Sequence, residues 1–107
     1  MKIDVMALLD SGADISVIPK GLAEFLDLDL SGVRETANGI GGEVSVIATN
    51  IIVYVEKGHE SYNFKIPVQV VLEDKDDVPV ILGRTGFFDK FIIYFNQQEE
   101  KIRLKRL

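Results

Sequence analysis

The chain has 107 residues, of which 47% are apolar, and its 12 Lys and Arg against 17 Asp and Glu give a net charge of −5. This length fits a single domain over residues 1–107, and the acidic balance argues against nucleic acid as a partner, because phosphate binding needs a basic surface. The sequence has no Cys and one His, which excludes thiolate chemistry and weighs against a Ser-His-Asp set or a His-rich metal site. We therefore expect no metal and no cofactor.

The first half of the chain has the pattern of short strands around one helix. Apolar and β-branched residues predict strands over Ile3–Leu9, Ile15–Ile18, Val33–Thr36 and Glu43–Val55. A short amphipathic helix is predicted over Pro19–Leu26, because proline suits the first helical turn and apolar residues follow at spacings of three and four. Three glycines between the last two strands predict a flexible hairpin tip.

The second half continues the alternation of strands and turns. Strands are predicted over Tyr62–Leu72, Val78–Leu82, Phe91–Phe95 and Lys101–Lys105, and a second short helix over Arg84–Lys90. Pro67 predicts an edge position or a bulge, since proline cannot donate to a strand ladder. Many short strands with glycine turns and one or two short helices predict a mainly β, closed barrel-like domain.

The candidate catalytic motif is Asp10-Ser11-Gly12-Ala13, which follows a predicted apolar strand. Gly12 permits a tight turn with close backbone approach, and Ser11 supplies a hydroxyl that can lock it. One carboxylate cannot both activate water and protonate a leaving amine. Two carboxylates close enough to share one proton can do both. A chain with one such motif must then pair with a second copy to catalyse hydrolysis.

Three segments resemble the retropepsins, the retroviral-type aspartic peptidases. Leu8-Leu9-Asp10-Ser11-Gly12-Ala13-Asp14 resembles their active-site motif, and Val80-Ile81-Leu82-Gly83-Arg84 resembles their second signature. Gly39-Ile40-Gly41-Gly42 lies between the two, where the family has the tip of its flap. The resemblance covers nearly the whole chain, from about Val5 to Phe95.

The resemblance implies an acid-protease barrel with one half-site per chain, and thus a homodimeric endopeptidase that acts on extended peptides. Asp10 would be the catalytic aspartate, Ser11 would hydrogen-bond across the dimer axis, and Gly12 would offer its carbonyl to the substrate. Ala13 would complete the active-site loop. Viral members carry more residues before this motif than the nine found here, so the C-terminal strand is expected to supply much of the interface.

The same resemblance implies roles for the other two segments. Asp14 and Arg84 would form an intramolecular ion pair beside the site. Residues Gly39, Ile40, Gly41 and Gly42 would cover the substrate, and Ile81, Leu82 and Gly83 would form the second signature.

The sequence also permits two other interpretations. The module could dimerise and bind peptides without catalysis, or it could be a monomeric β-domain in which Asp10 only caps a tight turn. The first residues lack the pattern of a signal peptide, and no apolar run approaches the roughly 20 residues of a membrane span. We therefore expect a cytoplasmic protein that binds no membrane.

Overall fold

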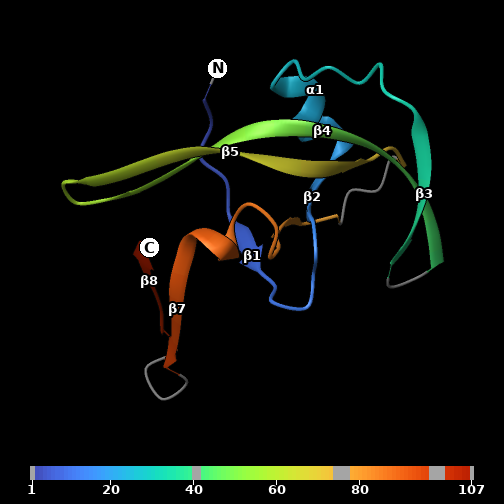
Figure 1. Ribbon diagram of the computed structural model, residues 1–107. Coiled ribbons are helices and arrows are strands. Elements are labelled where there is room, and N and C mark those ends of the chain that lie inside the picture. Colours follow the sequence, from blue (N-terminus) through green and yellow to red (C-terminus); the bar gives the residue numbers. More distant parts are fainter. Residues whose placement is uncertain (1, 40–41, 74–77, 97–100, 107) are drawn as a thin grey trace.

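The computed structural model describes residues 2–39, 42–73, 78–96 and 101–106. Its elements, in chain order, are mostly strands (Figure 1). They are β1 (Ala7–Leu9), β2 (Ser16–Pro19), α1 (Lys20–Phe25), β3 (Arg34–Gly39), β4 (Gly42–Lys57), β5 (Glu60–Val71), β6 (Val80–Leu82), the 3-10 helix η1 (Phe88–Lys90), β7 (Phe91–Asn96) and β8 (Lys101–Arg106). The prediction of a mainly β domain with one or two short helices is confirmed.

The first six strands form one curled sheet in the order β1-β6-β2-β5-β4-β3. The pairs β1–β6 and β2–β5 are parallel, whereas β2–β6, β3–β4 and β4–β5 are antiparallel. β7 and β8 form a separate antiparallel hairpin, which projects to the same side of the long β4–β5 ribbon as the β3–β4 hairpin (Figure 1). The sheet is a half-barrel with β1 and β3 at its edges, so among the described strands the barrel is curled rather than fully closed.

The first strand is shorter than predicted. We expected it to begin at Ile3, but β1 begins at Ala7, and the side chains of Ile3 and Val5 are exposed. The reason lies in the partner strand, because β6 has only three residues and pairs with Ala7–Leu9 alone. An apolar pattern predicts a strand, but the strand exists only where another strand meets it.

The prediction that Pro67 marks an edge or a bulge holds in part: Pro67 is paired with β4 but not with β2, so β5 is locally an edge there, and no bulge interrupts the β4–β5 register. β5 lies inside the sheet between β2 and β4, and its register with β4 runs without interruption through the pair Asn50–Pro67. Pairing with β2 begins one residue later, at Val68. The missing N–H of Pro67 therefore falls just before the β2 ladder and does not break it.

The second predicted helix, Arg84–Lys90, is largely wrong. Only the 3-10 turn Phe88–Lys90 is helical, and Gly86 has a φ of +84°. A Cβ at Gly86 would lie 2.9 Å from Cδ of Pro67, so the chain turns here through close contact with β5 instead of coiling.

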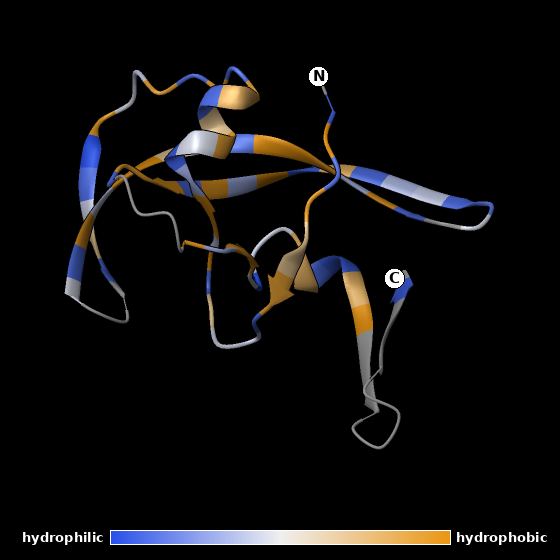
Figure 2. Cartoon of the chain, turned by 180° about the vertical axis from the view of Figure 1, so that it is seen from behind, coloured by the Kyte–Doolittle hydropathy of each residue, from blue (hydrophilic) through white to orange (hydrophobic). Residues whose placement is uncertain are grey.

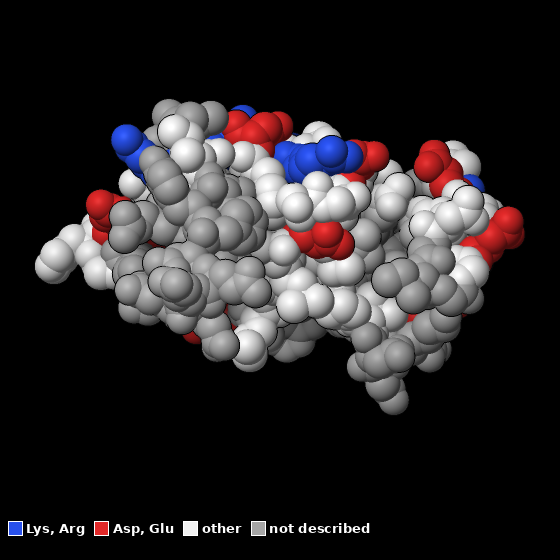
Figure 3. Space-filling model, turned by 90° about the horizontal axis from the view of Figure 1, so that it is seen from below, with Lys and Arg blue, Asp and Glu red and all other residues white. Residues whose placement is uncertain are grey.

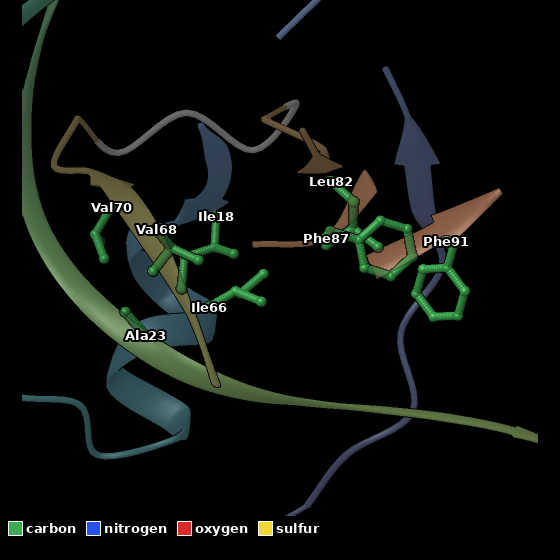
Figure 4. Packing of buried hydrophobic residues seen from close by; sticks show 8 residues of the cluster. All are labelled: Ile18, Ala23, Ile66, Val68, Val70, Leu82, Phe87 and Phe91. Atoms are coloured by element: carbon green, nitrogen blue, oxygen red, sulfur yellow. The ribbon is translucent and has the colours of Figure 1, made fainter. Parts of the chain in front are cut away.

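A compact apolar core joins α1, the central strands and the segment after β6. Figure 4 shows aliphatic side chains of β2 and β5 on one side and two phenylalanine rings on the other. Its buried members are Ile18, Ala23, Ile66, Val68, Val70, Leu82, Phe87 and Phe91. The ring centroids of Phe87 and Phe91 are 5.2 Å apart, within the range of favourable aromatic packing. Apolar residues run along the middle of the β4–β5 ribbon and give way to hydrophilic ones at its far end (Figure 2).

The face of the molecule seen from below carries charged side chains of both signs (Figure 3). Acidic and basic side chains alternate across the face shown in Figure 3 instead of gathering into one basic surface. Lys2 forms an ion pair of 2.8 Å with Glu56 and lies 4.4 Å from the ring centroid of Tyr54. The hydrogen bond to Glu56 raises the pKa of Lys2. Within the ranges that the structure describes, no helix has the length and apolar character needed to cross a membrane.

Candidate active site

The Asp10 loop begins where β1 ends and is closed by its own hydrogen bonds. The N–H of Asp10 donates to the carbonyl oxygen of Leu82 at 3.0 Å, which extends the β1–β6 ladder by one residue. The N–H of Ala13 donates to the Asp10 carbonyl at 3.1 Å, and the N–H of Gly12 donates to Asp10 Oδ1 at 2.8 Å. The loop thus fixes the carboxylate of Asp10 while leaving the residue exposed, as Ser11 is too.

Gly12 is suited to its contact with Asp10. A Cβ at this position would lie 3.2 Å from Asp10 Oδ1, closer than most Cβ contacts. Glycine therefore allows the backbone amide to reach the carboxylate without displacing it.

The second signature lies directly beneath this loop. Strand β6 is sandwiched between β1 and β2, with Ile81 opposite Leu8 on one side and Val17 on the other. Because β6 contacts the strands on both sides of the loop, it sets the distance between the two ends of residues 10–15.

The chain after β6 continues along the loop and bonds to it. The N–H of Arg84 donates to the Ala13 carbonyl, and the N–H of Thr85 donates to the Asp14 carbonyl, each at 2.9 Å. The N–H of Gly83 donates to Oγ of Ser16 at 2.9 Å, and Ser16 is fully buried. Together with the bond between Asp10 and Leu82, these contacts hold the loop along its length.

The two segments approach each other closely at Gly83. A Cβ at this residue would lie 2.7 Å from the carbonyl oxygen of Ala13 and 3.0 Å from the carbonyl carbon of Ile15. Both contacts are with backbone, which cannot rotate away as a side chain could. The arrangement therefore requires glycine at position 83.

Asp14 and Arg84 are brought together as an ion pair, with Nη2 of Arg84 donating to Oδ1 of Asp14. Their side chains are 77% and 55% exposed, respectively, in the single chain. This pair adds a side-chain contact to the backbone bonds between the same two segments.

The β3–β4 hairpin projects to the same side of the sheet as the loop that follows β1 (Figure 1). Its ladder runs from the pair Arg34–Ile47 to the pair Gly39–Gly42. Gly42 has a φ of +113°, a conformation that favours glycine. Ile40 and Gly41, the other two residues expected at the flap tip, lie outside the described residues.

Two residues with evident structural roles were missed from the sequence. Ser16 stands in a β-branched run, and a serine there could have indicated a buried hydroxyl with a specific partner. Glu73 begins a charged run typical of an exposed loop, yet it is only partly exposed, and its Oε1 accepts a hydrogen bond from the N–H of Ser45 at 2.8 Å. Its place at the start of an acidic run gave no signal of that contact.

The chemistry that this arrangement can perform follows from the exposed carboxylate of Asp10 on a hydrogen-bonded loop. Asp10 has a fixed oxygen, Oδ1, bonded to Gly12, and this leaves the carboxylate free to meet a second acid or a water molecule. No group of three or more His, Cys, Asp and Glu side chains suited to a metal ion is found in the part of the chain that the structure describes.

Comparison with known families gives a match over most of the chain. A family model described as "Aspartyl protease" matches residues 2–85, a span that begins before β1 and ends at Thr85, the last residue bonded to the loop. No curated protein sequence matches the chain.

Proposed function

The chain belongs to the aspartyl protease family, and from this premise we propose that it is a homodimeric, retropepsin-like endopeptidase. Two copies of Asp10, one from each chain, would share the hydrolysis of a peptide bond. The observation that carries the proposal is the Asp10 loop, whose backbone is bonded to residues 82–85 while its carboxylate stays exposed.

The chemistry assigns a different task to each carboxylate. Two carboxylates a few ångströms apart share one proton, because like charges at that distance do not both ionise. The ionised Asp10 accepts a proton from water, whose oxygen attacks the scissile carbonyl carbon. The protonated Asp10 donates to the carbonyl oxygen. As the C–N bond breaks, a proton passes to the leaving nitrogen, so that a carboxylic acid and an amine are released.

The neighbouring residues would support this step. Ser11 would bond to the opposite loop across the dimer axis, and the carbonyl of Gly12 would accept a hydrogen bond from the substrate backbone. Ala13 and Gly83 would keep the loop in place through the contacts described above. The ion pair of Asp14 and Arg84 would flank the site.

The β3–β4 hairpin would act as the flap. An extended peptide would add to the hairpin as a further strand, with main-chain bonds giving affinity and side-chain pockets giving selectivity. Residues Gly39, Ile40, Gly41 and Gly42 would then cover the substrate. The expected partners are therefore a second copy of the chain and an extended peptide or protein.

Exposed apolar side chains beside the loop support a dimer. Met6 and Leu8 are 96% and 58% exposed; Met6 comes just before β1, and Leu8 lies within β1, the edge strand that leads to Asp10. A partner chain at this edge would cover these groups and bring its own Asp10 near. The cytoplasmic location expected from the sequence stays a prediction.

The test combines sedimentation with a mixing experiment on a library of short random-sequence peptides. Wild-type protein should sediment as a dimer. Its rate of peptide cleavage per mole of protein should fall when the protein is diluted, because the dimer dissociates. Adding inactive Asp10→Asn chains should lower the rate more steeply than adding buffer, since mixed dimers hold one carboxylate.

Three results would contradict the proposal in different ways. Dimers without cleavage would indicate a peptide-binding module. Monomers without cleavage would indicate that the motif is structural. Cleavage by a monomer, unaffected by Asp10→Asn chains, would exclude the shared site.

A further inference from the structure

Where the β3–β4 hairpin leaves the sheet, a side-chain oxygen accepts a hydrogen bond that a backbone carbonyl would accept in a continuous ladder. The β4–β5 ladder ends at the pair Val46–Val71, whereas the β3–β4 ladder continues to Gly39–Gly42. Beyond Val46, strand β4 is thus paired only with β3. Ser45 is the first residue of this projecting part.

Ser45 nevertheless has two bonds toward β5. Its carbonyl oxygen accepts from the N–H of Leu72 at 2.9 Å, as an antiparallel ladder would require. The reciprocal bond would run from the Ser45 N–H to the Leu72 carbonyl. The structure instead has this N–H donating to Oε1 of Glu73, at 2.8 Å. The carboxylate of Glu73 replaces a backbone acceptor at the point where the chain leaves the sheet.

This contact has features that set it apart from an ordinary surface carboxylate. A bond from an amide to an ionised acceptor is stronger than one to a neutral carbonyl. Oε2 of Glu73 is buried, and no hydrogen-bond partner is found for it among the described groups. Burying such an oxygen has a cost. The bond to Ser45 is therefore kept at a cost that an exposed side chain at this position would not have.

We infer that Glu73 is a positioning residue for the flap, a role that rests on the proposed function. By holding Ser45, Glu73 determines where the fixed part of β4 ends and where the hairpin that covers the peptide begins to move. Flap opening and closing would pivot beyond Ser45, at residues 42–44 of β4 and 37–39 of β3. Glu73 touches neither substrate nor Asp10 and would act through this pivot alone.

Amide hydrogen exchange tests the contact without any assay of activity. In the wild-type dimer, the Ser45 amide should exchange slowly, like that of Ile47, which lies within the β4–β5 ladder. The Glu43 amide, two residues further out on the same side of β4, should exchange rapidly. Equal rates for Ser45 and Glu43 would refute the inference even if every variant failed to fold.

Variants of Glu73 then show whether the contact with Ser45 depends on the acceptor oxygen or on the negative charge. Glu73→Leu keeps a similar volume and removes the acceptor, and Glu73→Asp keeps the charge but shortens the reach. Each should speed exchange at Ser45 several-fold and leave Val70 protected. Glu73→Gln keeps an acceptor oxygen and should stay close to wild type. Glu60→Leu, at the far end of the same β4–β5 hairpin, is the matched control.

Kinetics on a peptide that the wild type cleaves tests the role. Glu73→Leu and Glu73→Asp should raise KM several-fold with little change in kcat, because a misplaced flap weakens binding of the ground state and transition state alike. Glu73→Gln and Glu60→Leu should leave both constants unchanged. Faster exchange at Ser45 with an unchanged KM would overturn the positioning role. Absence of cleavage by the wild type would refute the proposed function and this role with it, while the exchange data would still decide whether the contact exists.

Discussion

Oγ of Ser16 accepts a hydrogen bond of 2.9 Å from the N–H of Gly83 in the interior of the fold. This bond joins the strand that follows the Asp10 loop to the residue that follows β6. The segment that follows Asp10 and the segment around Gly83 are therefore parts of one structural unit. A substitution in either segment should disturb the structure of the other.

Ser16→Ala should destabilise the fold by about 1–3 kcal/mol, because it leaves the buried N–H of Gly83 without an acceptor. Urea unfolding of the variant measures the loss. Ser61→Ala, at an exposed position of β5, is the control and should unfold like the wild type. Equal stability of the two variants would mean that the Gly83 amide finds another partner.

Gly83→Ala should destabilise by at least about 1–3 kcal/mol, because the new methyl group would overlap the backbone of Ala13 and Ile15. Gly21→Ala is the matched control. Its Cβ would have no neighbour within 4 Å, and alanine favours the helix α1 in which it lies. The melting temperature should therefore fall for Gly83→Ala and stay unchanged or rise for Gly21→Ala. A tolerated alanine at position 83 would contradict the close approach.

Asp10→Asn should abolish peptide hydrolysis and leave the fold intact. The amide oxygen can still accept the bond from Gly12, but an amide cannot act as the general base. Asp27→Asn is the control, since Asp27 is exposed and has a φ of 54°, which asparagine tolerates well. Turnover and melting temperature are measured for both variants. Wild-type turnover in Asp10→Asn would show that the nucleophilic water is activated elsewhere.

The ion pair of Asp14 and Arg84 should contribute little to the stability of a single chain. Both side chains are more than half exposed, and exposed pairs are worth about 0–1 kcal/mol. A double-mutant cycle of Asp14→Ala and Arg84→Ala measures the coupling energy, which should shrink as salt is added. A coupling well above this range under dimeric conditions would mean that the partner chain buries the pair. Strict additivity in both states would mean that the pair has no energetic role.

The rate of hydrolysis should fall at both ends of the pH range. The proposed pair of Asp10 carboxylates works with one shared proton, so it fails when it holds two protons or none. A pH profile of kcat/KM measures this dependence. Activity that kept rising through alkaline pH would exclude the two-carboxylate mechanism.

Much of the fold and the family could be predicted from the sequence. The apolar runs gave the strands, and the two signatures around Asp10 and Gly83 gave the family, which the family match confirms. These patterns are local in the sequence, so they can be recognised without knowing how the strands pair. The roles of the individual residues in catalysis and dimerisation stay predictions.

The errors arose where distant segments meet. The length of β1 depends on the three residues of β6, and the course of the chain at Gly86 depends on contact with Pro67. The bond between Glu73 and Ser45 likewise depends on where β5 leaves the sheet. Neither periodicity nor turn propensity carries this information, because it belongs to the packing of the whole sheet.

The bonds between the Asp10 loop and residues 82–85 have a consequence for biosynthesis. The ribosome makes Asp10 before it makes residues 82–85, whose backbone groups hold the loop. A nascent chain that ends before Leu82 lacks every one of these supports. The Asp10 loop can therefore adopt its final structure only after residues 82–85 have been made, so a translation product that ends before Leu82 would carry the aspartate without the contacts that hold its loop.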